Sequence, residues 1–276
     1  MGIPGFYKEI IQNNGEIMIP IFKVHRRIDY FYIDANSLIY DSAGELGEEA
    51  TNETVIQTLI EKLQSLISRV KPKHLTMISF DGVVPMAKMH QQRTRRYKSG
   101  LSDKDGREWN THNITPGTEF MDEMSRRVKD VLQSESVYIS DVDEYGEGEH
   151  KIFSHVRKLT SRQTIVVYGL DADLILLSVL HERLTQQTFL LRDTPSFIKK
   201  LNPRLSPNVE YYMDISHFKT KLVGSLDVAK IDVDTLINDF VFICSLLGND
   251  FLPHSPSLSL RHDGMNILLK EYRICL

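Results

Sequence analysis

The chain has 276 residues, of which 41% are hydrophobic and 25% are charged, with 2 cysteines. This composition excludes a disordered, collagen-like or disulfide-stapled protein. The formal net charge of −4 excludes a protein that coats nucleic acid through its overall charge.

Strand and helix patterns alternate along the chain. Short runs rich in β-branched and aromatic residues predict strands at Tyr30–Ile33, Leu75–Phe80, Ser136–Ile139 and Thr164–Tyr168. Apolar positions at helical spacing predict helices at Thr54–Val70, Thr118–Leu132, Lys151–Leu159 and Asp232–Leu247. Later runs are expected to add strands in a hairpin or at a sheet edge, at Thr188–Arg192 and Val209–Ile215. The alternation predicts an α/β fold with a central, mostly parallel sheet and helices on both faces, in a single domain over residues 1–276.

Acidic residues follow the predicted strands at the points where the strands end. Asp34 follows the first strand and Asp81 the second, and the fourth strand leads to Asp171 and Asp173. The carboxyl ends of parallel strands share one edge of the sheet, where ligands bind in open α/β sheets. We therefore expect these side chains to converge at that edge.

Further carboxylates are expected from loops. The segment Gly146-Glu-Gly-Glu149 places Glu147 and Glu149 between the third strand and a helix, and its glycines permit close backbone approach. Asp250 follows Gly248, which marks the end of the last predicted helix. Any one of these acids alone is more simply a turn residue or a helix cap. It is their number that favours a common site.

Carboxylates crowded at one sheet edge repel one another unless cations neutralise them. An oxygen-only ligand set, without a Cys or His cluster, favours Mg²⁺ or Mn²⁺ over zinc. A pair of such ions is the usual means of in-line displacement at phosphorus, so the pattern predicts a two-metal phosphodiesterase site. A structural calcium site is the alternative, although it does not need ligands from several strand ends.

Residues 85–99 form a basic segment soon after Asp81. One face of the helix predicted here carries Lys88, Gln92, Arg95 and Arg96. No acidic residue lies between Asp81 and Asp103 to pair with these cations. Cations and an amide donor on one face predict a phosphate pocket beside the metal site. The alternative is that these cations form a basic helix face that is only hydrated and binds no ligand.

Ordered sequence blocks extend over nearly the whole chain. They are Met1–Phe6, Tyr32–Asn36, Asp81–Arg96, Ile114–Met121, Gly146–Lys151, Tyr168–Leu174 and Gly248–His254. In content and order these blocks resemble the first conserved region of the Xrn 5′→3′ exoribonucleases. The resemblance implies a fold similar to that of the PIN and flap nucleases.

The resemblance also implies roles for the residues singled out above. It implies metal coordination by Asp34, Asp81, Glu147, Glu149, Asp171, Asp173 and Asp250. It implies that the 5′ monophosphate of single-stranded RNA is held by Lys88, Gln92, Arg95 and Arg96. Bulkier capped and triphosphorylated ends are then excluded, and hydrolysis releases mononucleotides stepwise. RNA as the substrate and the direction of attack come from the resemblance alone.

The chain departs from the family pattern in places. Tyr40 stands where the family commonly has a His that stacks on the first base; an aromatic ring can still stack, and packing in the core is the alternative. The residues after the Gly248 block hold no counterpart of the family's second conserved region. We therefore expect a minimal or truncated form, to which a protein partner could supply the missing walls of the active site.

Smaller features carry expectations of their own. Trp109, the only tryptophan, either stacks on a nucleotide or anchors its loop. Structural hydrogen bonding is the expected role of His150, with contact to substrate or help in proton transfer as the alternatives, and Asn36 is expected to orient neighbouring ligands. No apolar run is long enough to cross a bilayer, and no membrane partner is expected. The N-terminal segment is unlike a secretory signal, so we expect a cytoplasmic protein, with a nuclear location left open.

Two other functional classes fit the same residues. A flap-type endonuclease or a DNA exonuclease shares this arrangement of sheet and carboxylates. A binding module that holds 5′ phosphates without cutting is the second alternative. A protein of that kind usually lacks some of the carboxylates, whereas all of them are present in this sequence.

Overall fold

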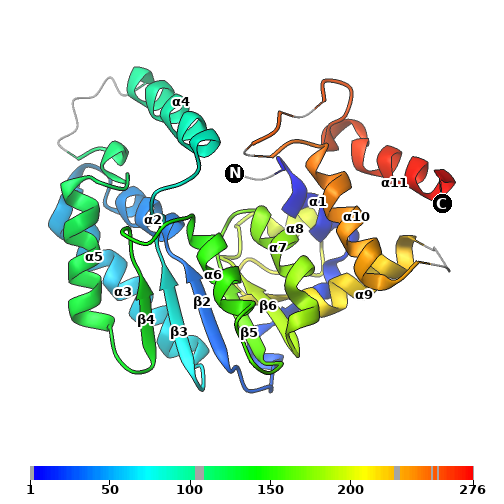
Figure 1. Ribbon diagram of the computed structural model, residues 1–276. Coiled ribbons are helices and arrows are strands. Elements are labelled where there is room, and N and C mark those ends of the chain that lie inside the picture. The colour runs from blue at the N-terminus through cyan, green and yellow to red at the C-terminus, as the bar shows by residue number, and fades with distance from the viewer. Residues whose placement is uncertain (1–2, 103–108, 227–230, 250, 254, 276) are drawn as a thin grey trace. The chain divides into compact units, whose positions relative to one another are not determined.

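The computed structural model describes residues 3–102, 109–226, 231–249, 251–253 and 255–275 (Figure 1). It divides into two units, which we describe in turn. The first unit is Arg27–Lys158, and the second joins Met1–Arg26 to Leu159–Leu276. Among the described residues, no helix combines the length and the hydropathy needed to span a bilayer.

The first unit is built on parallel strands. In order across the sheet they are β2 (Tyr30–Asp34), β3 (Leu75–Ser79) and β4 (Val137–Ser140). The register pairs Asp34 with Ser79, and Ser79 with Ser140, so the three strands end level with one another. Phe31, Tyr32 and Ile33 are fully buried, as expected for a strand covered on both faces.

Helices cover both faces of these strands (Figure 1). The helices of this unit are α2 (Asn36–Leu46), α3 (Asn52–Val70), α4 (Met86–Ser102), α5 (Glu119–Leu132) and α6 (Gly148–Val156). Helix α6 packs on β2 and β3, and α3 packs against α2 and α5. Thr51 and Thr54 form a capping box that starts α3, whose apolar stripe is buried along its length.

Trp109 anchors the segment that precedes α5. Its side chain is only 8% exposed, and its indole N–H donates a hydrogen bond of 3.0 Å to Asn52 Oδ1. Its ring meets that of Phe120 edge to face, with the centroids 5.5 Å apart. The structure therefore assigns Trp109 to the core, and the alternative in which it stacks on a nucleotide is not supported.

The second unit contains both parallel and antiparallel strands. They are β1 (Met18–Pro20), β5 (Thr164–Tyr168), β6 (Gln187–Leu191) and β7 (Tyr211–Asp214). Strand β5 pairs with β6 in parallel, whereas β6 with β7 and β7 with β1 are antiparallel. The two later runs are thus confirmed as neighbouring strands. The order β1-β7-β6 places them towards a sheet edge.

The longer helices of the second unit pack around β6 and one another. They are α1 (Phe6–Asn13), α7 (Asp173–His181), α9 (Ile215–Leu226), α10 (Val233–Ser245) and α11 (Gly264–Cys275), with the short α8 (Ile198–Leu201) beside α1. Helix α9 packs on β6 and α7, and α10 packs on α7 and α9. Cys244 of α10 is buried and free.

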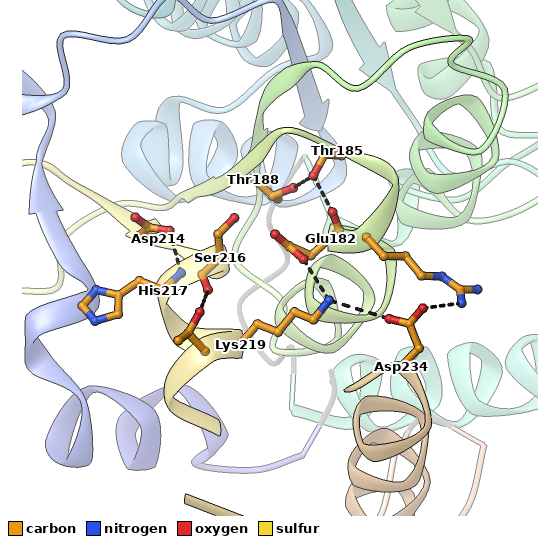
Figure 2. Close-up of polar contacts among 10 residues, drawn as sticks. Glu182, Thr185, Thr188, Asp214, Ser216, His217, Lys219 and Asp234 are labelled. Carbon is orange, nitrogen blue, oxygen red and sulfur yellow. Dashed lines mark hydrogen bonds and ion pairs between the residues drawn. The ribbon is translucent and has the colours of Figure 1, made fainter. Parts of the chain in front are cut away.

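A polar network joins three segments of the second unit (Figure 2). Lys219 of α9 lies 3.0 Å from Glu182, at the end of α7, and 3.8 Å from Asp234 of α10. Arg183 lies 3.2 Å from the same Asp234 carboxylate. The Lys219–Glu182 pair is largely enclosed, whereas Arg183 and Asp234 are exposed, and exposed ion pairs contribute little to stability. The network therefore links the end of α7 to α9 and α10 through ion pairs.

The predicted α/β class with mostly parallel strands and helices on both faces is confirmed. The single domain expected over residues 1–276 stays a prediction.

Trp109 should report on the fold and not on nucleic acid. Saturating single-stranded RNA, added without divalent metal, should leave the tryptophan emission unchanged because the ring is buried against Phe120. Asn52→Ala should admit water to the indole N–H, which shifts the emission to the red, and should lower the free energy of unfolding by about 1 kcal/mol through loss of the hydrogen bond. Quenching of the emission by RNA would contradict the assignment.

Candidate active site

Asp34 and Asp81 occupy adjacent strand ends in the first unit. Asp34 is the last residue of β2, and Asp81 follows β3 after Phe80. The backbone N–H of Asp81 donates a hydrogen bond of 3.1 Å to Asn36 Oδ1. The Asp81 carboxylate in turn accepts one of 2.7 Å from the Gly148 N–H. Asn36 thus orients the Asp81 segment, as the sequence led us to expect.

Glu147 and Glu149 belong to the start of α6. Glu147 is the N-cap residue and Glu149 lies in the first turn, where the helix dipole favours negative charge. Gly148, between them, packs so closely that a Cβ would lie 2.7 Å from Asp34 Oδ1. Glycine allows this approach without displacing the Asp34 carboxylate, and the approach brings the start of α6 against the end of β2.

The loops that carry Asp81 and Glu147 are fastened to each other. The Gly82 N–H donates to the Gly146 carbonyl and the Gly146 N–H to the Val83 carbonyl, both at 2.9 Å. A Cβ on Gly82 would lie 1.9 Å from the Glu144 carbonyl oxygen, so this contact also requires glycine. The structure therefore brings together Asp34, Asp81, Glu147 and Glu149 as the sequence predicts.

A buried ion pair joins the carboxylates to the basic helix. Lys88 Nζ of α4 lies 2.7 Å from Glu147 Oε2. The two residues are only 7% and 5% exposed. Glu147 Oε1 is also buried, and it accepts no hydrogen bond from the residues that the structure describes. A carboxylate oxygen in that state fits a cation ligand, and so does the oxygen-rich donor set around it.

The environment of Asp81 favours its protonated form. Burial raises the pKa of Asp81, and the negative charge of Glu147 acts in the same direction. The hydrogen bond from Gly148 and the positive charges of Lys88 and Lys151 oppose this shift without cancelling it. A proton therefore competes with a metal ion for this carboxylate.

Lys151 lies close to these carboxylates, a position that the sequence patterns did not reveal. It lies on α6 with its side chain buried, and its ammonium group donates hydrogen bonds to the backbone carbonyls of Phe80, at 2.8 Å, and Asp141, at 2.6 Å. These carbonyls follow β3 and β4, so Lys151 ties the two strand ends together next to Asp81. Only its place in the Gly146–Lys151 block set it apart in the sequence.

The residues predicted for the phosphate pocket lie on α4. Lys88 is buried, and Gln92 and Arg96 are partly exposed on the same face. Arg96 Nη2 donates a hydrogen bond of 3.2 Å to Gln92 Oε1, so these two side chains are neighbours. Arg95 lies on α4 as expected, but its side chain is outside the described part of the structure.

Tyr40 lies on α2 with 41% of its surface exposed. This exposure excludes the alternative in which Tyr40 is a core residue. A role in stacking on a base stays a prediction.

The remaining candidates belong to the second unit. Asp171 follows β5, and Asp173 is the first residue of α7. Arg192 donates a hydrogen bond of 2.5 Å to the Leu170 carbonyl, so it holds the segment that carries Asp171. The Arg192 guanidinium also lies 4.0 Å from the centroid of the Tyr7 ring. Asp250 is outside the described residues.

Comparison with protein families identifies matches along most of the chain. The profile described as "XRN 5'-3' exonuclease N-terminus" matches residues 1–107 and 100–194. The profile described as "Xrn1 helical domain" matches residues 230–276. Both matches agree with the ordered sequence blocks.

Curated relatives and solved structures agree with these profiles. The 5′-3′ exoribonuclease 2 of Yarrowia lipolytica is 26% identical over 99% of this chain and 35% of its own length. The 5′-3′ exoribonuclease 1 of Homo sapiens is 27% identical over 99% of this chain and 18% of its own length. The chain thus spans only about a third of the first relative, at 35%. The catalytic core of Rad2 in complex with DNA substrate has a TM-score of 0.54 at 12% identity, covering 98% of this chain and 68% of that chain, which shows that the two share a fold.

Divalent metal should stabilise the protein more strongly at about pH 7.5 than at about pH 5.5, because Asp81 has a raised pKa. In the metal-free protein, the contribution of Asp81 to stability falls as the pH rises from about 4 towards its raised pKa, and a bound cation offsets that loss. Thermal unfolding with and without Mn²⁺ at both pH values measures the difference. Asp81→Asn should reduce this difference in Mn²⁺ stabilisation between the two pH values. If Mn²⁺ raises the unfolding temperature equally at both pH values, in the native protein and in Asp81→Asn alike, the assignment is contradicted.

Proposed function

Because this chain belongs to the XRN 5′-3′ exonuclease family, we propose that it is a divalent-metal-dependent exoribonuclease. In this proposal it removes mononucleotides stepwise from the 5′ end of single-stranded RNA that carries a 5′ monophosphate. The proposal concerns a chain of 276 residues, which matches only part of its longer relatives.

The observation that carries the proposal is the 2.7 Å contact between Lys88 and Glu147. It supports the proposal because it places the first cation of the α4 face in contact with one of the proposed metal ligands. A terminal phosphate held on α4 therefore lies beside carboxylates suited to metal ions. That combination is what a nuclease needs if it recognises a 5′ phosphate and cuts the neighbouring phosphodiester bond.

The carboxylates hold the metal in this proposal. Asp34, Asp81, Glu147 and Glu149 supply oxygen ligands, and the sequence adds Asp171, Asp173 and Asp250 to the set. Mg²⁺ or Mn²⁺ ions, expected as a pair, would activate water and offset charge on the scissile phosphate. Asn36, Gly148 and Lys151 keep the Asp81 segment in place, so that its carboxylate meets the ion without a large rearrangement.

The face of α4 recognises the end of the RNA. Lys88 is buried and offers a point charge, whereas arginine side chains offer paired N–H donors that suit phosphate oxygens. The proposed set is Lys88, Gln92, Arg95 and Arg96. Tyr40, exposed on α2, is proposed to stack on the first base. A further polypeptide with the family's second conserved region would close the site and favour cutting from the end.

The two alternatives predict different products. The fold is shared with the catalytic core of Rad2, which was solved with a DNA substrate, so internal cutting or a DNA substrate is the first alternative. A binding module without activity is the second. The buried, well-fixed carboxylates favour cleavage over binding alone.

Matched RNAs distinguish these functions. They carry a label at the 3′ end and a 5′ hydroxyl, monophosphate or triphosphate, and single-stranded DNA serves as the control. With Mg²⁺ or Mn²⁺, we expect progressive shortening of the monophosphorylated RNA and little attack on the others. Internal cuts regardless of the 5′ group would indicate an endonuclease, and binding without cutting would indicate a binding module.

Arg96→Ala should weaken the preference for monophosphate over hydroxyl ends by about 10–100-fold, since a hydrogen bond to a charged group contributes roughly 1.5–3 kcal/mol. Arg93→Ala is the matched control, because Arg93 is an exposed arginine of α4 outside the proposed face. The ratio of kcat/KM for the two RNA ends measures the effect. An equal loss in both variants would mean that α4 attracts RNA through general charge and has no specific pocket.

A further inference from the structure

His150 lies in the first turn of α6, directly after Glu149, and its side chain is exposed. One of its ring nitrogens and one carboxylate oxygen each from Glu147 and Glu149 all lie within 4.8 Å of one another. Within the described part of the chain, the imidazole has no hydrogen-bond partner. The structure therefore does not support the structural hydrogen-bonding role expected for His150 from the sequence.

A second observation concerns the same Glu147 carboxylate. Glu147 is only 5% exposed, and its Oε1 atom has no hydrogen-bond partner among the described residues. Its other oxygen is held by Lys88 at 2.7 Å, so the carboxylate is fixed in orientation. A buried, unpaired carboxylate oxygen is costly unless a ligand satisfies it.

We propose that His150 is a nitrogen ligand of the metal centre and that the centre therefore prefers a transition ion such as Mn²⁺ to Mg²⁺. The inference rests on the metal dependence in the proposed function and adds a residue and a metal preference to it. In this arrangement, the His150 imidazole binds the metal from the solvent-exposed side, and the carboxylates bind it from the buried side.

The spacing of the donor atoms suits a single ion. At bond lengths of about 2.1 Å, two ligands on opposite sides of an ion lie roughly 4.2 Å apart. The three donor atoms lie within 4.8 Å of one another, so small rotations, which the exposed His150 side chain can make, bring them to bonding distance of one ion. No large movement of the fixed Glu147 carboxylate is needed.

The donor chemistry sets the metal preference. Mg²⁺ binds almost entirely to oxygen and keeps much of its water, whereas imidazole suits transition ions, most strongly Zn²⁺, Cu²⁺, Fe²⁺ and Ni²⁺. Mn²⁺ accepts carboxylates and imidazole together. A His ligand therefore adds affinity for Mn²⁺ while adding little for Mg²⁺.

Pulsed electron paramagnetic resonance of the full chain with Mn²⁺ tests the proposal, because nitrogen bound directly to Mn²⁺ gives a characteristic modulation. We expect this modulation in the native protein and its loss in His150→Gln. His90→Gln is the matched control, since His90 is an exposed histidine of α4 and belongs to no such donor group among the described residues; it should keep the modulation. Circular dichroism verifies that each variant is folded.

Calorimetric titration with Mn²⁺ and Mg²⁺ provides the second readout. His150→Gln should lower the ratio of Mn²⁺ to Mg²⁺ affinity by about 10-fold or more, within the range typical of lost support at metal sites. Bound Mn²⁺ without nitrogen modulation, or modulation that persists in His150→Gln, would overturn the inference and leave the nuclease proposal intact. Failure of the native protein to bind either ion would overturn both.

Discussion

The candidate site depends on one buried ion pair, that of Lys88 and Glu147. Removing one partner of a buried pair typically costs about 3–5 kcal/mol, whereas replacing both with apolar residues is often neutral. Stability alone therefore does not explain why both charges are buried. Both buried charges are explained if the pair belongs to a binding site. Lys88 orients the Glu147 carboxylate towards a bound metal ion, and it also places the first positive charge of α4 beside that carboxylate.

The surrounding backbone keeps this pair in position. Gly148 allows the start of α6 to meet Asp34, and the two 2.9 Å hydrogen bonds between the Gly82 and Gly146 segments align the acidic loops. Lys151 fastens the ends of β3 and β4 beneath them. Backbone contacts of this kind hold functional groups more firmly than long side chains do, so we expect the first unit to meet its ligands largely preformed.

The sequence predicted those features that follow from local patterns. The Thr164–Tyr168 strand was predicted with its observed bounds because it is a continuous buried run, and the strand-end position of Asp34 followed from the geometry of parallel sheets. Helix α7 was missed since its mostly apolar run, Asp173–His181, has no polar face to show helical periodicity. The burial of Lys151 could not be predicted, because its partners are backbone carbonyls that only the folded sheet brings within reach. The contact of Lys88 with Glu147 depends on packing between distant segments in the same way.

The most direct test of a single site made of carboxylates and the α4 face is a crystal structure with Mn²⁺ and a 5′-phosphorylated nucleotide. The account predicts anomalous scattering from Mn²⁺ within bonding distance of Glu147 and Glu149, with the 5′ phosphate against Lys88 and Arg96. Mn²⁺ bound away from these carboxylates, or a phosphate held on another surface, would contradict it.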